Sequence, residues 1–137
     1  MKQEYFDNIV RVCSYSMTSA HDAMLNMVDM LKNLARLKEG QEFVAADLAT
    51  PHQTLTEFVY RLAQYGHLSR ETMPILVVRE EPCTITRETR FWDRDTNVTI
   101  TKIWSKEVTR KVYKMNCNPA IMLEIAFKVA EQCRVVI

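Results

Sequence analysis

Along the first 38 residues, apolar side chains recur at intervals of three and four, which is the spacing of an amphipathic helix. The pattern predicts one helix from Lys2 to Met17, with polar residues opposite the apolar stripe. It predicts a second helix from Ala20 to about Lys38, preceded by Thr18 and Ser19 as capping residues. Apolar residues lie on more than one side of this second helix. We therefore expect it to be buried on two sides, within one domain or against a second subunit.

The next part of the chain is predicted to form short elements. Glu42-Phe43 has the composition of a very short strand, and Val44–Ala49 that of a short apolar helix. A longer helix is predicted from Pro51 to about Tyr65, because Pro suits the first helical turn and Thr50 is a good capping residue. Gly66 is then expected to end this helix.

After residue 73 the spacing of apolar residues changes to two, as in β-strands. Pro74–Val78 is a β-branched run, and Val108–Met115 alternates between apolar and polar residues. Thr84–Trp92 and Val98–Trp104 flank a polar segment, Asp93–Asn97, that suits a hairpin loop. The pattern therefore predicts a β-meander of three or four strands.

A final helix is predicted to open at Asn118-Pro119 and to carry a clean apolar stripe as far as Cys133. Helices, then a β-meander, then a helix define an α+β fold. We expect a single domain, residues 1–137, made of four consecutive parts. These are N-terminal helices (1–39), a central helical part (40–68), a β-meander (73–116) and a C-terminal helix (118–133).

Several of these segments follow the order of a known architecture. An amphipathic helix, Met24–Leu37, is followed by a short helix containing Ala45–Ala49 and by a longer helix that ends in Arg61–Leu68. Far downstream, Lys111–Asn116 looks like the returning strand of a wing. The passage Met24–Leu68 thus resembles the winged helix-turn-helix superfamily. The resemblance implies a winged helix-turn-helix core with an extra N-terminal helix, an enlarged hairpin or meander as the wing, and a C-terminal helix.

The resemblance also implies that the N-terminal part of the helix from Pro51 lies in the DNA major groove. Gln53 would then pair with adenine, Arg61 with guanine or phosphate, and Thr54 with phosphate. The residues implied to face the DNA are His52, Gln53, Thr54, Glu57 and Arg61. Between Pro51 and Gly66, however, the chain has one Arg and no Lys, which is sparse for a helix that reads a groove.

Positive charge concentrates in the predicted hairpin. Residues 87–114 hold eight Lys or Arg and four Asp or Glu, although the net charge of the whole chain is only +1. The cations either contact the DNA backbone or form an ordinary solvated face of the sheet. The two tryptophans are expected to stack across the strand pair or, alternatively, to form a protein-binding hot spot. The candidate contact residues of the hairpin are Arg87, Arg90, Trp92, Arg94, Lys102, Trp104 and Lys106.

Two functions fit these features best. The first is a small regulatory protein that binds double-stranded DNA and forms a homodimer through its N- and C-terminal helices. The alternative is a protein-binding module on the same scaffold, such as a phage-type inhibitor of a host nucleic-acid enzyme. The sparse charge of the helix from Pro51 favours this alternative. A structural subunit of an assembly is a third class that the apolar terminal helices allow.

Other classes of function have no support in the sequence. There is no phosphate-binding loop, nucleophile elbow or metalloprotease motif, and the three His lie far apart. We therefore expect neither an enzyme nor a metal or cofactor site. The N-terminus lacks the apolar run of a secretory signal, and no stretch approaches the roughly 20 apolar residues of a membrane span. The four Cys are scattered, as is typical of free thiols in a reducing compartment, so we expect a cytoplasmic protein.

Overall fold

The computed structural model describes residues 2–16 and 21–134, and the predicted capping residues Thr18 and Ser19 lie outside these ranges. Within them the chain forms four α-helices and one three-stranded antiparallel sheet, which confirms the predicted α+β class. The elements, in chain order, are α1 (Gln3–Ser16), α2 (His21–Leu34), β1 (Glu42–Phe43), the 3-10 helix η1 (Ala45–Leu48), α3 (His52–Tyr65), β2 (Ile75–Asp93), β3 (Val98–Met115) and α4 (Pro119–Cys133).

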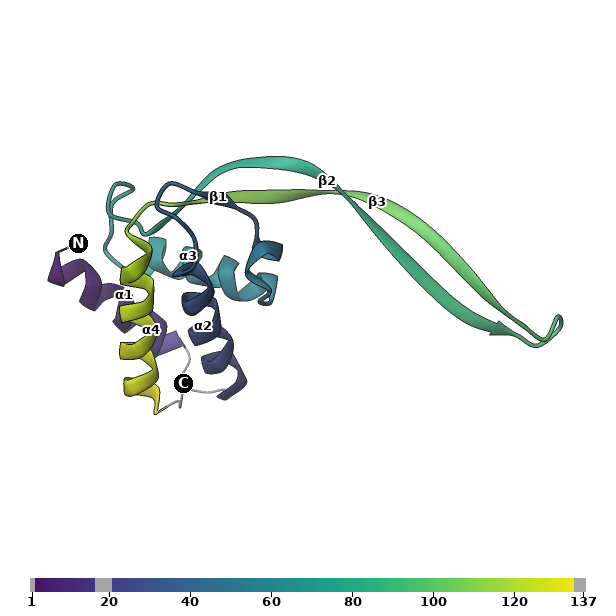
Figure 1. Cartoon of the computed structure of the whole chain (residues 1–137), viewed down its shortest axis with the longest axis horizontal. Helices are drawn as coiled ribbons and strands as arrows, with labels where there is room; N and C mark the ends of the chain where they lie inside the picture. The colour runs from purple at the N-terminus through teal and green to yellow at the C-terminus, as the bar shows by residue number, and fades with distance from the viewer. Residues whose placement is uncertain (1, 17–20, 135–137) are drawn as a thin grey trace.

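The helices enclose one apolar core. α4 packs against α2 and α1, and α3 packs against α1, α2 and η1 (Figure 1). Every α-helix contributes to this cluster, as do the inner ends of the strands. Among its completely or almost completely buried side chains are Ile9, Met27, Leu31, Phe58, Leu62, Tyr113 and Ile125. Because each such side chain contributes roughly 1.5–3 kcal/mol on burial, the helical body and the root of the sheet hold the fold together.

Only the inner end of the sheet belongs to this core. The strand order is β1–β3–β2, and the short strand β1 pairs with the inner end of β3. There the rings of Phe43 and Tyr113 stack with their centroids 5.7 Å apart. Ile75 and Met115, which pair where β2 begins and β3 ends, are completely buried. The root of the sheet is therefore anchored from both strands.

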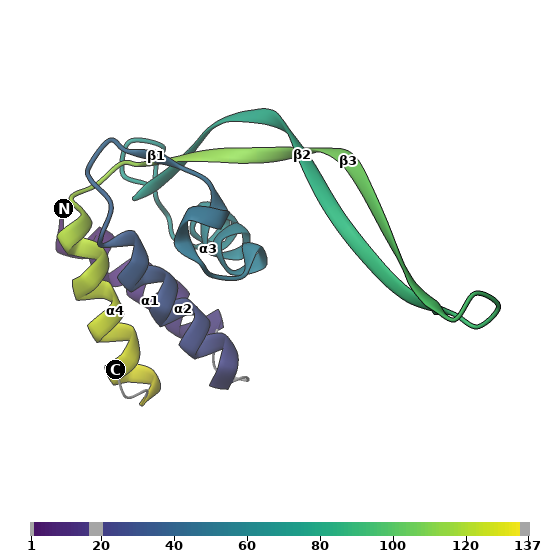
Figure 2. The same cartoon turned by 45° about the vertical axis from the view of Figure 1, so that its right-hand side comes forward.

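Beyond the core, β2 and β3 continue as one long hairpin that projects from the helices (Figures 1 and 2). We call residues 79–112 of this hairpin the arm. At about 3.3 Å per residue it is roughly 45–50 Å long. The predicted meander of three or four strands is therefore wrong, because its segments merge into two continuous strands. The segments that merge are Pro74–Val78 with Thr84–Trp92, and Val98–Trp104 with Val108–Met115. Pro82 does not end β2, since a strand of a two-stranded ribbon has a free edge that tolerates a missing N–H.

A β-bulge lies where the arm leaves the core. Val77 pairs with Tyr113 and Arg79 with Val112, so Val78 has no partner position in β3. A bulge of this kind bends a ribbon and increases its twist. The hairpin follows a curved path in both views (Figures 1 and 2).

The N-terminal end of α3 differs from the prediction, and its C-terminal end agrees with it. The capping position is Pro51 and has no side-chain hydrogen bond, so the predicted cap by Thr50 is wrong. The Thr50 hydroxyl is instead buried without a hydrogen-bond partner among the described residues. At the other end Gly66 ends the helix, as predicted. Its lack of a side chain is required there, because a Cβ would lie 2.6 Å from the carbonyl oxygen of Leu62.

Three other boundaries complete the comparison. α2 ends at Leu34 and a turn follows, so the helix is shorter than the one predicted to reach Lys38. The short helix predicted at Val44–Ala49 is a 3-10 helix instead of an α-helix. The last helix begins as predicted, with the Asn118 side chain accepting a hydrogen bond from the backbone N–H of Ala120.

Candidate nucleic-acid interface

The arm is highly exposed. No residue between Pro82 and Thr109 is buried, although a two-stranded hairpin alone is only marginally stable in water. Six large apolar side chains of this segment have exposed fractions from 38 to 71 %. They are Ile85, Phe91, Trp92, Val98, Ile103 and Trp104. Apolar side chains gathered on an exposed surface in this way are typical of a region that binds a partner.

The register of β2 and β3 sorts the side chains of the arm onto two faces. Directly opposed residues share a face, and so do alternate residues along one strand. Arg87 opposes Trp104 and Phe91 opposes Ile100, so these four side chains lie on one face. We call the stretch of this face from the Cys83–Val108 pair to the Phe91–Ile100 pair the cationic face. Its members are Cys83, Ile85, Arg87, Thr89, Phe91, Ile100, Lys102, Trp104, Lys106 and Val108.

Cations and aromatic rings lie together on the cationic face. The guanidinium carbon of Arg87 lies 5.8 Å from the ring centroid of Trp104, and Nζ of Lys102 lies 5.8 Å from that of Phe91. This stretch has three cations, Arg87, Lys102 and Lys106, and no acidic residue; Glu81 and Asp93 continue the same side of the ribbon beyond its two ends. None of the three forms an ion pair with another residue in the described ranges. The face therefore combines uncompensated positive charge with flat apolar surface.

The opposite face of the arm has a different character. Over the same length of the arm its members are Thr84, Thr86, Glu88, Arg90, Trp92, Thr99, Thr101, Ile103, Ser105 and Glu107. It holds one cation and two acidic residues, and Nε of Arg90 donates a hydrogen bond to Oε1 of Glu88 at 2.9 Å. The hydroxyls of Thr86 and Ser105 lie 3.4 Å apart across the strands. This face is rich in hydroxyl groups and has no excess of positive charge.

The two tryptophans do not form the predicted cross-strand stack. Trp92 opposes Thr99 on the opposite face, whereas Trp104 opposes Arg87 on the cationic face. The stack was a wrong prediction because the two residues lie at unequal distances from the hairpin loop. Residues at unequal distances from a loop cannot oppose each other.

The loop at the end of the arm is closed by Asp93. This residue accepts a hydrogen bond from the backbone N–H of Asn97 through its carbonyl oxygen (2.9 Å), and another from that of Asp95 through its carboxylate (3.0 Å). Asn97 adopts the left-handed conformation, with φ of 59°. Arg94, one of the predicted contact residues, lies between the two aspartates in the chain. The tip therefore has a net negative charge, which disfavours its close approach to phosphate groups.

Four charged side chains from three strands meet at the root of the arm. Arg79 pairs with Glu42 and, at 3.5 Å, with Glu81, which also accepts hydrogen bonds from Nη2 (2.6 Å) and Nε (2.9 Å) of Arg110. The hydrogen bonds from Arg110 hold the pKa of Glu81 below its ordinary value. The hydrogen bond to Glu42 raises the pKa of Arg79, so both shifts favour the charged forms. These cations are compensated, unlike those of the cationic face.

The residues predicted on α3 do not form a positive patch. His52, Gln53 and Glu57 are exposed, whereas Thr54 and Arg61 are partly buried at the flanks of the helix. Nε of Arg61 lies 3.8 Å from Oε2 of Glu57, so the single Arg of α3 is beside a carboxylate. The charge of the candidate interface therefore comes from the arm and not from α3.

Several members of the cationic face were not singled out from the sequence. They are Ile85, Phe91, Ile100 and Val108, which alternate with the cations along the strands. The period of two was visible in the sequence, but it assigns residues to a common face only when the register between the strands is known. The register in turn depends on the length of the loop between Asp93 and Val98.

Other kinds of site have no counterpart in the described residues. These contain no group of three or more His, Cys, Asp or Glu placed to hold a metal ion. No helix among them is long and apolar enough to span a membrane. Two of the cysteines, Cys13 and Cys117, are buried, and burial raises the pKa of both thiols, that of Cys117 to about 11. A high pKa leaves little thiolate at neutral pH, so neither thiol is suited to nucleophilic chemistry.

Fold and site together define an α+β protein with a projecting hairpin whose two faces differ in charge. No protein-family model, no curated protein and no solved structure matches the chain.

Proposed function

We propose that this chain is a small DNA-binding regulatory protein of winged helix-turn-helix architecture, in which the arm makes the main contact with double-stranded DNA. The order of the elements supports this architecture, since α2, β1, η1, α3 and the hairpin follow one another along the chain. The strand order β1–β3–β2 also supports it, because the returning strand β3 lies in the middle of the sheet. In this proposal the arm is an elongated wing.

The observation that carries the proposal is the composition of the cationic face. Its three cations can each contact a phosphate group, because no acidic residue of the described chain is paired with them. A two-stranded ribbon also has the width that the major groove of DNA admits. The rings of Phe91 and Trp104 then lie against sugars or bases. Since the tip is acidic, the arm lies along the duplex and does not insert its end.

In this proposal α3 has a secondary role. Gln53 and His52 are exposed near its N-terminus and can reach base edges. The charge of Arg61 is offset by Glu57, so α3 adds little electrostatic affinity. Sequence preference would come from Gln53, and most of the affinity from the arm.

The proposal is tested by titrating a fluorescent random-sequence duplex with the full chain and measuring anisotropy at about 50 mM salt, where phosphate contacts are strongest. We expect saturable binding that weakens steeply as salt is added. Absence of binding at this salt concentration would refute the proposal.

A second candidate function is supported by the opposite face of the arm. Ile103 and Trp92 are 71 % and 57 % exposed there, among hydroxyl groups and without excess positive charge, which fits a protein partner better than DNA. A photo-crosslinking amino acid placed at Trp104 or at Ile103 separates the two functions, since these neighbouring residues lie on different faces. Adducts with DNA formed from position 104 support the first function. Adducts with a protein formed only from position 103 support the second.

A further inference from the structure

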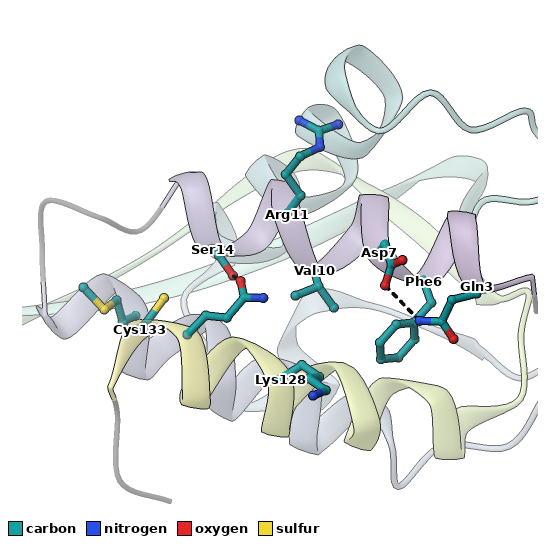
Figure 3. Close-up of a pocket in the computed structure, with 10 residues that line it drawn as sticks. Gln3, Phe6, Asp7, Val10, Arg11, Ser14, Lys128 and Cys133 are labelled. Carbon is teal, nitrogen blue, oxygen red and sulfur yellow. Dashed lines mark hydrogen bonds between the residues drawn. The ribbon is translucent and has the colours of Figure 1, made fainter.

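A second apolar surface lies away from the arm, on α1 and α4. α4 exposes Leu123 (39 %) and Phe127 (55 %), although most of its apolar residues are buried. A hollow of about 830 Å³ lies between α1 and α4, and Phe6 and Val10 are among the residues that line it (Figure 3). Phe6 also lines a smaller hollow together with Phe127. The surface thus has an exposed ring next to a depression that is lined by apolar side chains together with charged ones, among them Asp7, Arg11 and Lys128.

The charges around this surface are balanced. Four exposed charged residues of α4 and its end are Glu124, Lys128, Glu131 and Arg134, two of each sign. Nζ of Lys128 lies 3.6 Å from Oε2 of Glu131, and both side chains are more than half exposed. Balanced charge does not attract DNA. A surface with both signs on one side can instead complement itself.

We propose that this α1–α4 face binds a second copy of the same chain, with the two α4 helices antiparallel about a two-fold axis. In such a contact the same side of each helix meets the same side of the other. Glu124 and Lys128 are four residues apart and therefore share a side of α4. Each Lys128 then faces Glu124 of the second copy, and the two Phe127 rings, each one residue from the two-fold axis, lie against one another. This inference goes beyond the proposed function and does not depend on DNA binding.

Sedimentation equilibrium of the full chain without DNA tests the proposal, at concentrations from about 10 µM to about 1 mM. We expect the mass to rise from 16.0 kDa towards twice that value. Phe127→Glu should remain a monomer over this range, because the ring and its contact are lost and a charge is added. Tyr60→Glu is the matched control, since Tyr60 is 60 % exposed on α3, and it should associate like the unmodified chain.

A charge exchange tests the orientation of the two helices. Glu124→Lys and Lys128→Glu should each weaken association about 3- to 30-fold. Each substitution places two like charges opposite one another, and the two-fold axis repeats this contact. The double variant Glu124→Lys, Lys128→Glu should recover the original association. A chain that is monomeric at every concentration, a Phe127→Glu variant that still dimerises, or a double variant weaker than both single ones would overturn the proposal. Circular dichroism of each variant checks that the helices are intact. Because no DNA is present, these outcomes are independent of the proposed function.

Discussion

Neutralising the cationic face should change the salt dependence of DNA binding by an amount that the structure sets. The perturbation is the triple variant Arg87→Gln, Lys102→Gln, Lys106→Gln. These three cations have no ion-pair partner in the described part of the chain, so each is available for one phosphate group. Arg79 and Arg110 at the root of the arm are paired with Glu42 and Glu81, so we expect no phosphate contact from them.

The expected magnitude follows from counterion release. With about 0.9 of a counterion released per phosphate contact, three contacts give a slope of log K against log salt of about −2.7. Binding should then weaken by about 40-fold between 50 and 200 mM salt. The triple variant should lose this slope almost completely. Lys106→Gln alone should make the slope less steep by about 0.9, and Lys106, unlike Arg87 and Lys102, forms no cation–π contact among the described residues.

The assay is fluorescence anisotropy of a random duplex at four or more salt concentrations, with the slope as the measured quantity. Arg90→Gln is the matched control, because Arg90 lies in β2 like Arg87 but on the opposite face, where it pairs with Glu88. Its slope should equal that of the unmodified chain. The reasoning fails if the triple variant keeps the original slope, or if Arg90→Gln lowers the slope as much as Lys106→Gln does.

Three further predictions concern stability. Gly66→Ala should destabilise the fold by about 1–3 kcal/mol in urea unfolding, because its Cβ would lie 2.6 Å from a backbone oxygen; an unchanged midpoint would contradict this. Asn118→Ala should lower the free energy of unfolding by about 1 kcal/mol, because the cap of α4 is lost. Asn118→Ser should keep most of the stability of the unmodified chain, because Ser can also cap the helix. Hydrogen bonds from Arg110 lower the pKa of Glu81, so its contribution to stability is present above the ordinary pKa of 4.5 and is lost as pH falls through the folded-state value. The melting temperature of Glu81→Gln should therefore fall less steeply than that of the unmodified chain over this range, and parallel curves would refute the role of the ion cluster.

The sequence correctly predicts two helix ends that depend on a single residue each. Asn118 caps α4 through its own side chain, and Gly66 is the C-terminal capping residue of α3, at a position where a Cβ would lie 2.6 Å from the carbonyl oxygen of Leu62. Such effects act within one turn of helix, so they are visible in the sequence. The cap by Thr50 was mispredicted because Pro51 occupies the capping position without any side-chain hydrogen bond.

The arm was predicted only in part, because its geometry depends on pairing over long distances. The predicted strand segments leave a gap at residues 79–83, but β2 runs through it because a ribbon with a free edge tolerates Pro82. The bulge at Val78 has no signal in the sequence, yet it changes how the two faces of the arm are oriented relative to the root of the sheet. The cationic face could therefore be assembled only after the register was known.

The distribution of charge also indicates which surfaces of this protein meet each other. A long ribbon with free edges and exposed apolar side chains tends to associate with other chains. Two cationic faces would repel one another, because each holds Arg87, Lys102 and Lys106 and no acidic residue. An anionic partner removes this repulsion and covers Phe91 and Trp104 at the same time. The α1–α4 face has balanced charges and so meets no such barrier with a second copy. The distribution of charge therefore supports both proposals together, self-association through the helices and DNA contact through the arm.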